Sequence, residues 1–239
     1  MIELKNIDFL SQSIEAISSF IPEGNFRFNE KGIHFRGVDP SQVVLVDYSI
    51  DKKLFDSYDI EPSFVGVNLS ELNKILSRAQ PQDELNIDLS ESEIKLKFKG
   101  ELNRSFKLPL IDISDDELKV PEVNYDAVVE INARLFKEAL KDASLFSSSV
   151  VLNTKGDKFY LESKGSAGNL NSNSHTKNVK VKAKKDVTSK YSLGFLQNIA
   201  KHADPDSDIV IELKSDSPMK VSYSIGDSVI KFYLAHMLL

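Results

Sequence analysis

VNLSELNKIL, at residues 67–76, and YSLGFLQNIA, at residues 191–200, carry the same apolar spacing 124 positions apart. The corresponding apolar residues are Leu69 and Leu193, Leu72 and Leu196, and Ile75 and Ile199. Apolar residues three and four positions apart lie on one face of an α-helix. Each segment is therefore expected to form an amphipathic helix, and the repeat indicates an internal duplication.

The correspondence continues along both halves of the 239-residue chain. The earlier matches are Phe9 with Leu135, Ile14 with Leu140, Phe20 with Phe146, and residues 28–32 with 152–156. The later matches are Pro81 with Pro205, Ile87 with Ile211, Leu89 with Leu213, Phe106 with Phe232, and Leu108 with Leu234. An ordered series of this kind predicts two similar domains, at residues 1–115 and 126–239.

The segment between the two halves, DISDDELKVPEVNY at residues 112–125, is acidic and contains Pro121. Proline has no amide hydrogen to give to a sheet, and it favours extended geometry in the residue before it. Crowded carboxylates repel one another and favour solvent. We therefore expect an interdomain connecting loop at residues 112–125.

Helical and strand-like patterns occur in both halves, which predicts an α+β fold with antiparallel sheets. Helical spacing covers residues 7–20, 69–79, 135–146 and 193–202. Apolar residues and lysines alternate in residues 94–99 and 179–184, as in strands with one buried face. Residues 167–175, AGNLNSNSH, are rich in Gly, Asn and Ser, and on propensity alone they are expected to form a loop.

The composition argues against the common classes of catalytic and metal site. The chain has no cysteine and a formal net charge of −6, and its four histidines, His34, His175, His202 and His236, are scattered. No phosphate-binding loop, dinucleotide motif or nucleophile elbow is present. No apolar run approaches the 18 residues of a membrane span. We expect no catalytic residue, cofactor, metal or membrane segment.

Five segments together carry a resemblance to a known family. They are GIHFRGVDPSQVVLVD at residues 32–47, KLPLID at 107–112, LKVPE at 118–122, SPMKV at 217–221 and FYLA at 232–235. They closely resemble the proliferating cell nuclear antigen family, the sliding clamps of archaea and eukaryotes, and the short loops look archaeal. The resemblance implies a ring of three subunits and six domains, with two helices per domain lining a hole and antiparallel sheets outside. Such a ring is a non-catalytic scaffold in DNA replication and repair.

By this resemblance, basic residues on the helices face duplex DNA without sequence preference. They are Lys74, Arg78, Lys137, Lys141 and Lys201. The competing interpretation is that these are ordinary solvated helix residues, with Arg78 and Lys201 complementing helix C-termini. The first helix departs from the family, since residues 7–21 contain no Lys or Arg.

The resemblance also implies a groove beside the connecting loop that accepts a peptide with a glutamine and paired aromatic residues. Its residues are Val38, Gln42, Val43, Leu45, Leu118, Val120, Pro121, Tyr125, Pro218, Tyr233, Leu234 and Ala235. An apolar cleft would hold the aromatic anchors. Here His236 replaces the usual proline after Leu234-Ala235.

The subunit interface implied by the family pairs a strand near residues 102–110 with one near 167–175, which would turn the expected loop into an edge strand. The interface residues are Leu102, Arg104, Phe106, Leu108, Gly168, Leu170, Asn171 and Asn173. A homotrimer is expected, with a heterotrimer as the alternative.

The expected partners are duplex DNA, a clamp loader, and a DNA polymerase, flap nuclease and ligase that carry clamp-binding peptides. The rival hypotheses are a specialised checkpoint-type or heterotrimeric clamp subunit and an uncharacterised α+β enzyme. An archaeal clamp would act in the cytoplasm on the nucleoid, and a eukaryotic one in the nucleus.

Overall fold

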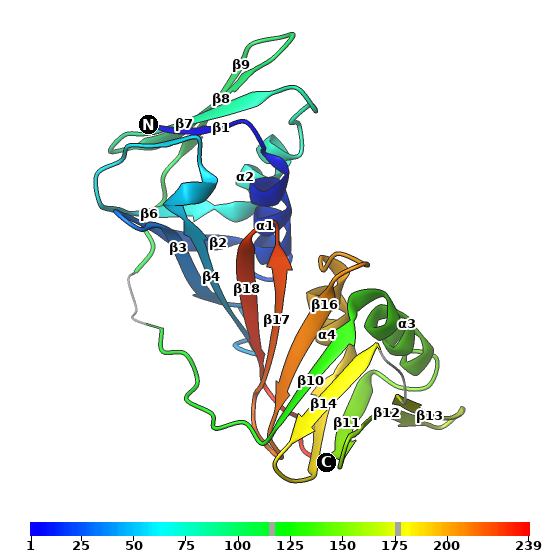
Figure 1. The fold of residues 1–239 in the computed structure, drawn as a ribbon. Helices are drawn as coiled ribbons and strands as arrows, with labels where there is room; N and C mark the ends of the chain where they lie inside the picture. Colours follow the sequence, from blue (N-terminus) through cyan, green and yellow to red (C-terminus); the bar gives the residue numbers. More distant parts are fainter. Residues whose placement is uncertain (115–117, 175–177) are drawn as a thin grey trace. The chain divides into compact units, whose positions relative to one another are not determined.

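The computed structural model describes residues 1–114, 118–174 and 178–239 (Figure 1). The acidic residues Asp115 to Glu117 of the expected connecting loop, and His175 at the end of the expected interface strand, lie outside this description. The chain forms two compact units. Unit 1 contains residues 1–40, 46–118 and 225–230, and unit 2 contains residues 41–45, 119–224 and 231–239.

The first half of the chain alternates strands with two α-helices. Its helices are α1 (Asp8–Ser18) and α2 (Leu69–Leu76), with a 3-10 turn η1 (Lys52–Leu54). Its strands are β1 (Ile2–Leu4), β2 (Glu23–Asn29), β3 (Gly32–Val38), β4 (Val44–Asp51), β5 (Ser57–Tyr58), β6 (Ser63–Asn68), β7 (Glu84–Leu89), β8 (Glu93–Lys99) and β9 (Arg104–Pro109).

The second half repeats this order. Its helices are α3 (Ala133–Ala143) and α4 (Leu193–Lys201). Its strands are β10 (Ala127–Asn132), β11 (Ser149–Lys155), β12 (Lys158–Gly165), β13 (Gly168–Ser174), β14 (Val179–Ala183), β15 (Val187–Ser192), β16 (Asp208–Leu213), β17 (Met219–Ile225) and β18 (Ser228–Leu234).

The strand order shows the duplication directly. One sheet has the order β5-β1-β7-β8-β9, and the strands β14-β10-β16-β17-β18 follow the same order in the second half. The set β4-β3-β2-β6 is matched in the same way by β13-β12-β11-β15. The described strand pairs are antiparallel. The predicted α+β fold of two similar domains is therefore confirmed.

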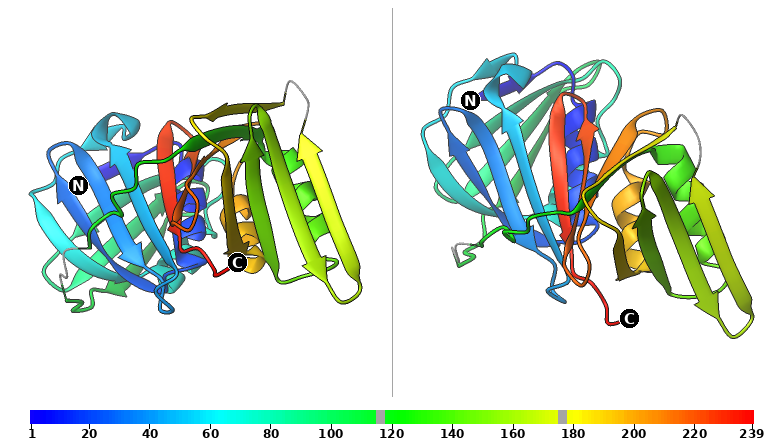
Figure 2. Two further views of the ribbon diagram at one scale, coloured as in Figure 1. Left: turned by 90° about the horizontal axis from the view of Figure 1, so that it is seen from below. Right: turned by 60° about the horizontal axis from the view of Figure 1, so that its bottom comes forward.

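In each half the two helices pack side by side and cover one face of the sheets (Figure 2). The buried side chains are the ones with helical or alternating spacing. In β8, Ile94, Leu96 and Phe98 are buried, and the two lysines between them are half-buried. Leu72 and Leu196, which match in the duplication, are both buried on their helices. The duplicated pattern thus records the apolar contacts of the core.

Four local expectations require correction. Residues 168–174 form strand β13 and not a loop, because their backbone pairs with β12 from Gly165–Gly168 to Phe159–Ser174. The second helix ends at Leu76 and not at residue 79. Ile75 is half-buried and does not lie fully against the sheet. Leu135 is 40% exposed, although its counterpart Phe9 is buried.

In the part of the chain that the structure describes, no helix has both the length and the apolar character needed to cross a bilayer.

Candidate interaction surfaces

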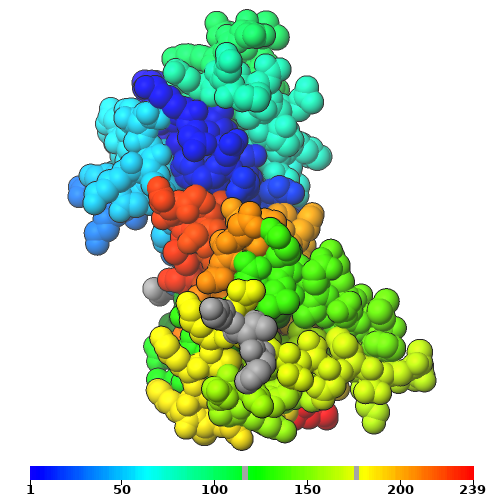
Figure 3. Space-filling view, turned by 45° about the vertical axis from the view of Figure 1, so that its right-hand side comes forward, coloured from blue at the N-terminus to red at the C-terminus, as the bar shows by residue number. Residues whose placement is uncertain are grey.

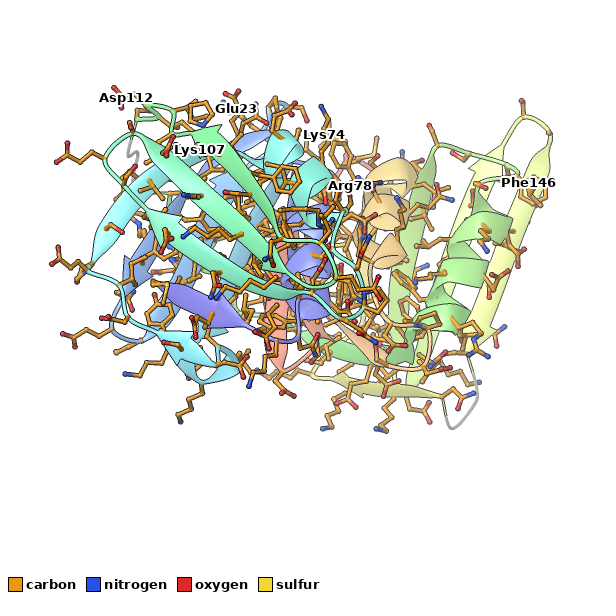
Figure 4. All side chains as sticks on the ribbon, turned by 90° about the horizontal axis from the view of Figure 1, so that it is seen from above. Glu23, Lys74, Arg78, Lys107, Asp112 and Phe146 are labelled. Atoms are coloured by element: carbon orange, nitrogen blue, oxygen red, sulfur yellow. The ribbon has the colours of Figure 1, made fainter. Side chains whose placement is uncertain are left out.

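Two of the expected DNA-facing lysines extend into solvent from the helices. Lys74 Nζ lies 2.6 Å from Glu71 Oε1, and Lys141 Nζ lies 2.7 Å from Glu138 Oε1. Both lysines are mostly exposed, at 70% and 66% of the side chain. An exposed pair three residues apart contributes only about 0.2–0.5 kcal/mol, so each lysine can exchange its glutamate for a phosphate at little cost. Lys74 lies on α2 near Arg78 in Figure 4.

Lys137 differs from these two. Its Nζ donates hydrogen bonds to the carbonyl oxygens of Lys201 at 3.0 Å and Ala203 at 2.6 Å, where α4 ends. Burial lowers the pKa of Lys137, Asp204 opposes this effect, and Lys141 adds to it. A cation at a helix C-terminus satisfies carbonyls that have no partner within the helix. The ammonium of Lys137 therefore holds α4 against α3.

Arg78 and Lys201 are exposed, as a DNA-facing role requires. Arg78 follows α2, and Lys201 is the last residue of α4. Arg134, at the start of α3, is a further exposed basic residue: its guanidinium contacts Asp206, and its side chain is 65% exposed. It is a third basic residue on that helix and lies one turn before the Lys137–Lys141 pair. By contrast, the exposed charges of α1 are Asp8 and Glu15.

Part of the expected groove lies in unit 1, at the start of the connecting loop. Val38 and Leu118 line the same hollow, which has a volume of about 680 Å³. Arg36 holds the loop there, because its Nη1 donates to the Leu118 carbonyl at 3.1 Å. Arg36 Nε and His34 Nε2 each lie 2.9 Å from Oδ1 of Asp47. Burial raises the pKa of Asp47, but the hydrogen bonds from His34 and Arg36 outweigh burial and lower it.

The other groove residues lie in unit 2. The Ala235 amide donates to the Val43 carbonyl at 2.9 Å, which joins the C-terminal segment to the turn containing Gln42. Leu45, Tyr233 and Leu234 are buried. Accordingly, these side chains support the surface from below, and the half-buried or exposed residues offer contact area. Those residues are Gln42, Val43, Val120, Pro121, Tyr125, Pro218 and Ala235.

Tyr125 lines a second hollow, in unit 2, of about 490 Å³. Its hydroxyl is buried, and none of the described residues forms a hydrogen bond with it. Burial raises the pKa of Tyr125, and Glu212 raises it further. Lys220 Nζ lies 5.7 Å from the centre of the Tyr125 ring. Tyr125, the last residue of the expected connecting loop, therefore lies among charged side chains.

The C-terminal tail continues past the position where the family has proline. His236 is half-buried, and the Met237 amide donates to the Lys190 carbonyl of β15 at 2.8 Å. Leu238 and Leu239 are 86% and 66% exposed. The tail thus adds one bridge to the β15 edge and then enters solvent.

β9 is an edge strand that carries most of the first expected interface set. Arg104 contacts Asp83, donates to the Arg78 carbonyl at 2.7 Å and lies 5.1 Å from the centre of the Phe98 ring. Phe106 is half-buried against Phe98, and Leu108 is buried. Leu102 precedes the strand and is 67% exposed. Arg104 is therefore anchored within its own unit, while Leu102 projects freely.

β13 is the edge strand that carries the second set. Gly168 begins it at φ +151°, a conformation that favours glycine over any residue with a side chain. Leu170 is half-buried, and Asn171 and Asn173 are exposed. Asn171 Nδ2 donates to Glu162 Oε1 on the neighbouring strand at 3.0 Å.

Comparison with known proteins gives matches over both halves. The family model for the proliferating cell nuclear antigen N-terminal domain matches residues 1–127, and the model for its C-terminal domain matches residues 119–237. A Methanococcus vannielii protein named DNA polymerase sliding clamp is 33% identical over 230 residues, covering 93% of this chain and 92% of the relative. A Methanococcus maripaludis protein of the same name is 32% identical over 234 residues, covering 93% of this chain and 92% of the relative.

Two solved structures share the fold. The proliferating cell nuclear antigen of Thermococcus kodakaraensis superposes with a TM-score of 0.93 at 24% identity, over 99% of both chains. That of Entamoeba histolytica superposes with a TM-score of 0.91 at 24% identity, over 99% of this chain and 98% of the other. With both halves matched by the family's own domain models, the chain belongs to the proliferating cell nuclear antigen family, the family of sliding clamps.

Proposed function

We propose that this chain is a DNA sliding clamp in which three copies close into a ring around duplex DNA. The observation that carries the proposal is a pair of strand edges, β9 and β13, beside which the described residues place no further strand. β9 lies at the end of its sheet, and β13 lies at the end of its own. An unpaired edge is a ready template for pairing with another chain.

The duplicated strand order supports the pairing of these two edges. β18 is the counterpart of β9, and β4 is the counterpart of β13. In the strand order β18 lies next to β4, and the Ala235 amide just after β18 donates to the Val43 carbonyl just before β4. If β9 of one copy lies next to β13 of the next copy, each chain repeats between molecules a pairing that it already makes within itself.

Hydrogen-bond alternation identifies which backbone groups are available at each edge. In β9, the Leu110 amide donates to Ser92 of the neighbouring turn at 2.9 Å, so Leu108 and Phe106 bond inward and Ser105 and Lys107 face outward. Lys107 marks this edge in Figure 4. Pro109, which has no amide hydrogen, is tolerated at an edge.

In β13, the two-residue turn that follows Gly165 makes the Gly165–Gly168 pair hydrogen-bonded, as in a tight hairpin. Alternation then directs the backbone groups of Asn169, Asn171 and Asn173 outward. The polar side chains that argued against a strand in the sequence leave these groups uncovered.

Duplex DNA would pass the helix faces, with Lys74, Lys141, Lys201, Arg78 and Arg134 as its phosphate contacts. Contacts of this kind carry no sequence information, and each contributes mainly through counterion release. With few basic residues on these helix faces and a net charge of −6, binding to short linear duplex should be weak, and ring closure would keep the clamp on the DNA. The proposal assigns no catalytic step, cofactor or metal to the chain.

The connecting-loop groove would hold clamp-binding peptides of a DNA polymerase, a flap nuclease and a ligase, and a clamp loader would open the ring. Support comes from the half-buried Val38 and Leu118 along one hollow and from the partly open Ala235 segment. The clamp would act on chromosomal DNA, either on the cytoplasmic nucleoid of an archaeon or in a eukaryotic nucleus.

The test uses native mass spectrometry of the full chain and two variants at one position. Asn171→Pro removes an outward amide hydrogen and leaves the inward pairs to β12 in place, and Asn171→Ala removes the same side chain but keeps that amide. The parent and Asn171→Ala should appear as a species of three 26.8 kDa chains, and Asn171→Pro as a folded monomer. A trimer that survives in Asn171→Pro would show that β13 is not the interface.

The second candidate is one subunit of a heterotrimeric or checkpoint-type clamp. Two observations favour it: α1 has no basic residue to face DNA, and β13 has few apolar side chains to support an interface. The same measurement decides between the two, because a parent chain that stays monomeric at micromolar concentration supports the heterotrimer and contradicts the homotrimer.

A further inference from the structure

The outer edge of β14 forms a surface that neither ring closure nor the connecting-loop groove uses. β14 is the last strand of its sheet, and among the described residues its one strand partner is β10. The Lys184 amide donates to the Asp126 carbonyl at 2.7 Å, and the Asn132 amide donates to the Asn178 carbonyl at 3.2 Å. These two hydrogen bonds therefore fix which backbone groups from Val179 to Ala183 point toward β10 and which point away from it.

Even-numbered residues of β14 bond inward, so alternation turns the backbone groups of Val179, Val181 and Ala183 outward. The segment lies at the surface in the space-filling view, in yellow (Figure 3). Over residues 179–183, the described part of the chain provides no second strand on this side. Three residues supply enough donors and acceptors for one short added strand.

The side chains along this edge are lysines, and two of them have no acidic partner. Lys180 pairs with Glu130 at 3.1 Å, and Lys185 pairs with Asp126 at 3.2 Å. Lys182 and Lys184 are exposed, and no carboxylate of the described residues lies within 4.0 Å of either ammonium. Edge lysines repel strands of the same charge. In this protein of net charge −6, Lys182 and Lys184 give the β14 edge a local positive charge. The edge should therefore favour a negatively charged strand.

A hollow adjoins this edge and provides an apolar contact. It is the 490 Å³ hollow of unit 2, and its walls include Val123, Val128, Ala183 and both free lysines. The carboxylate of Glu212 is also on the wall but contacts Lys220. Tyr125 also lines the hollow, and its hydroxyl is buried.

We propose that the β14 edge and this hollow bind an extended, acidic segment of a partner protein. The segment would pair with the backbone of Val179, Val181 and Ala183, set carboxylates against Lys182 and Lys184, and insert one apolar side chain beside Val128. Nucleic acid fits less well for two reasons. Its phosphates would also meet the carboxylates of Asp126 and Glu212, and duplex DNA has no peptide backbone that could pair with a strand edge.

The test uses the synthetic peptide acetyl-Glu-Val-Glu-Val-Glu-Val-amide, the full chain and two double variants. Lys182→Glu with Lys184→Glu reverses the free charges. Lys158→Glu with Lys164→Glu is the matched control, since both control lysines are exposed on another strand, β12, of the same unit. The peptide should bind the parent and the control equally. Its affinity for the first variant should fall by about tenfold or more, since two favourable charge pairs become repulsive.

Amide exchange followed by NMR tests the strand pairing independently of charge. Peptide binding should slow exchange at Val179, Val181 and Ala183, while Lys180 and Lys182 should change little because their amides already bond to β10. A peptide with N-methyl groups on alternate amides should lose this protection. No binding up to millimolar peptide, equal binding to all chains, protection of other residues, or displacement of the peptide from this edge by duplex DNA would each overturn the proposal.

The design separates this inference from the proposed clamp function. The Lys182 and Lys184 variant should still form trimers, because neither residue lies on β9 or β13. Loss of trimers in Asn171→Pro, conversely, should leave peptide binding unchanged.

Discussion

α1 and α3 occupy the same place in the two halves but carry opposite charge. Each has 11 residues and follows the first strand of its half. The formal charge is −2 on α1 and +1 on α3. Their buried faces, by contrast, correspond: Leu10, Ile14 and Ile17 match Phe136, Leu140 and Ala143, and all six are buried. The duplication has thus kept the packing face, and the exposed face has diverged.

The two helices are also held by different means. In α1, Ser13 Oγ lies 2.6 Å from the Tyr48 hydroxyl in the core of unit 1. At the corresponding position α3 has Ala139, and it is fixed instead through the Lys137 ammonium at the end of α4. One anchor is a buried neutral hydrogen bond and the other a charged one at the surface, so the halves should respond differently to substitution.

The largest effect should come from the buried faces. Phe136→Ala should lower the free energy of unfolding by about 3–5 kcal/mol and Leu10→Ala by about 2–5 kcal/mol, since each leaves a cavity in a close-packed core. Urea unfolding at fixed protein concentration measures both. Leu135→Ala, at an exposed position of α3, is the control. A cost below about 1 kcal/mol for Phe136→Ala would show that the two faces are not equivalent.

The buried anchor of α1 should have the next largest effect. Ser13→Ala should cost about 1–3 kcal/mol, because it takes a hydrogen-bond partner from the Tyr48 hydroxyl inside the core. The double variant with Tyr48→Phe should cost less than the sum of the single changes. Ala139→Ser, the reverse change on α3, should stay within about 0.5 kcal/mol. Strict additivity of Ser13→Ala and Tyr48→Phe would contradict the anchor.

The charged anchor of α3 should matter less. Lys137→Ala should cost about 1–2 kcal/mol, because the carbonyls of Lys201 and Ala203 lose a charged donor. Lys141→Ala, four residues away and exposed, should cost less than about 0.5 kcal/mol. Thermal melting of both variants gives the comparison. Equal melting temperatures would mean that Lys137 is a solvated lysine like its neighbour.

The smallest effect concerns DNA and tests the charge difference itself. Gln12 is exposed on α1, and Gln12→Lys would place a basic residue on a helix that has none. For a ring assembled on duplex, affinity should rise a few-fold at low salt, and each new phosphate contact should steepen the dependence of log affinity on log salt by about 0.9. Gln12→Ala is the control. An unchanged salt slope would place this face of α1 away from the DNA.

The loop expected at residues 167–175 shows where the sequence could not decide. Asn, Gly and Ser are poor strand residues, yet 168–174 pair with β12 throughout. The strand exists because its neighbour supplies hydrogen bonds, and a local propensity contains no information about that neighbour. Lys137 illustrates the same limit for a site residue. Its spacing from Lys141 indicated one exposed face, but the α4 carbonyls that bind it are more than 60 positions away.

The sequence by itself determined the duplication, the α+β class and the family, because apolar periodicity and motifs are properties of neighbouring residues. Only the tertiary structure decided which strand edges stay open, which lysines are already paired, and which groove residues are buried. Those properties depend on partners distant in the chain: β12 for β13, Glu130 for Lys180, and the core for Leu234. Packing brings these partners together, and no local pattern specifies them.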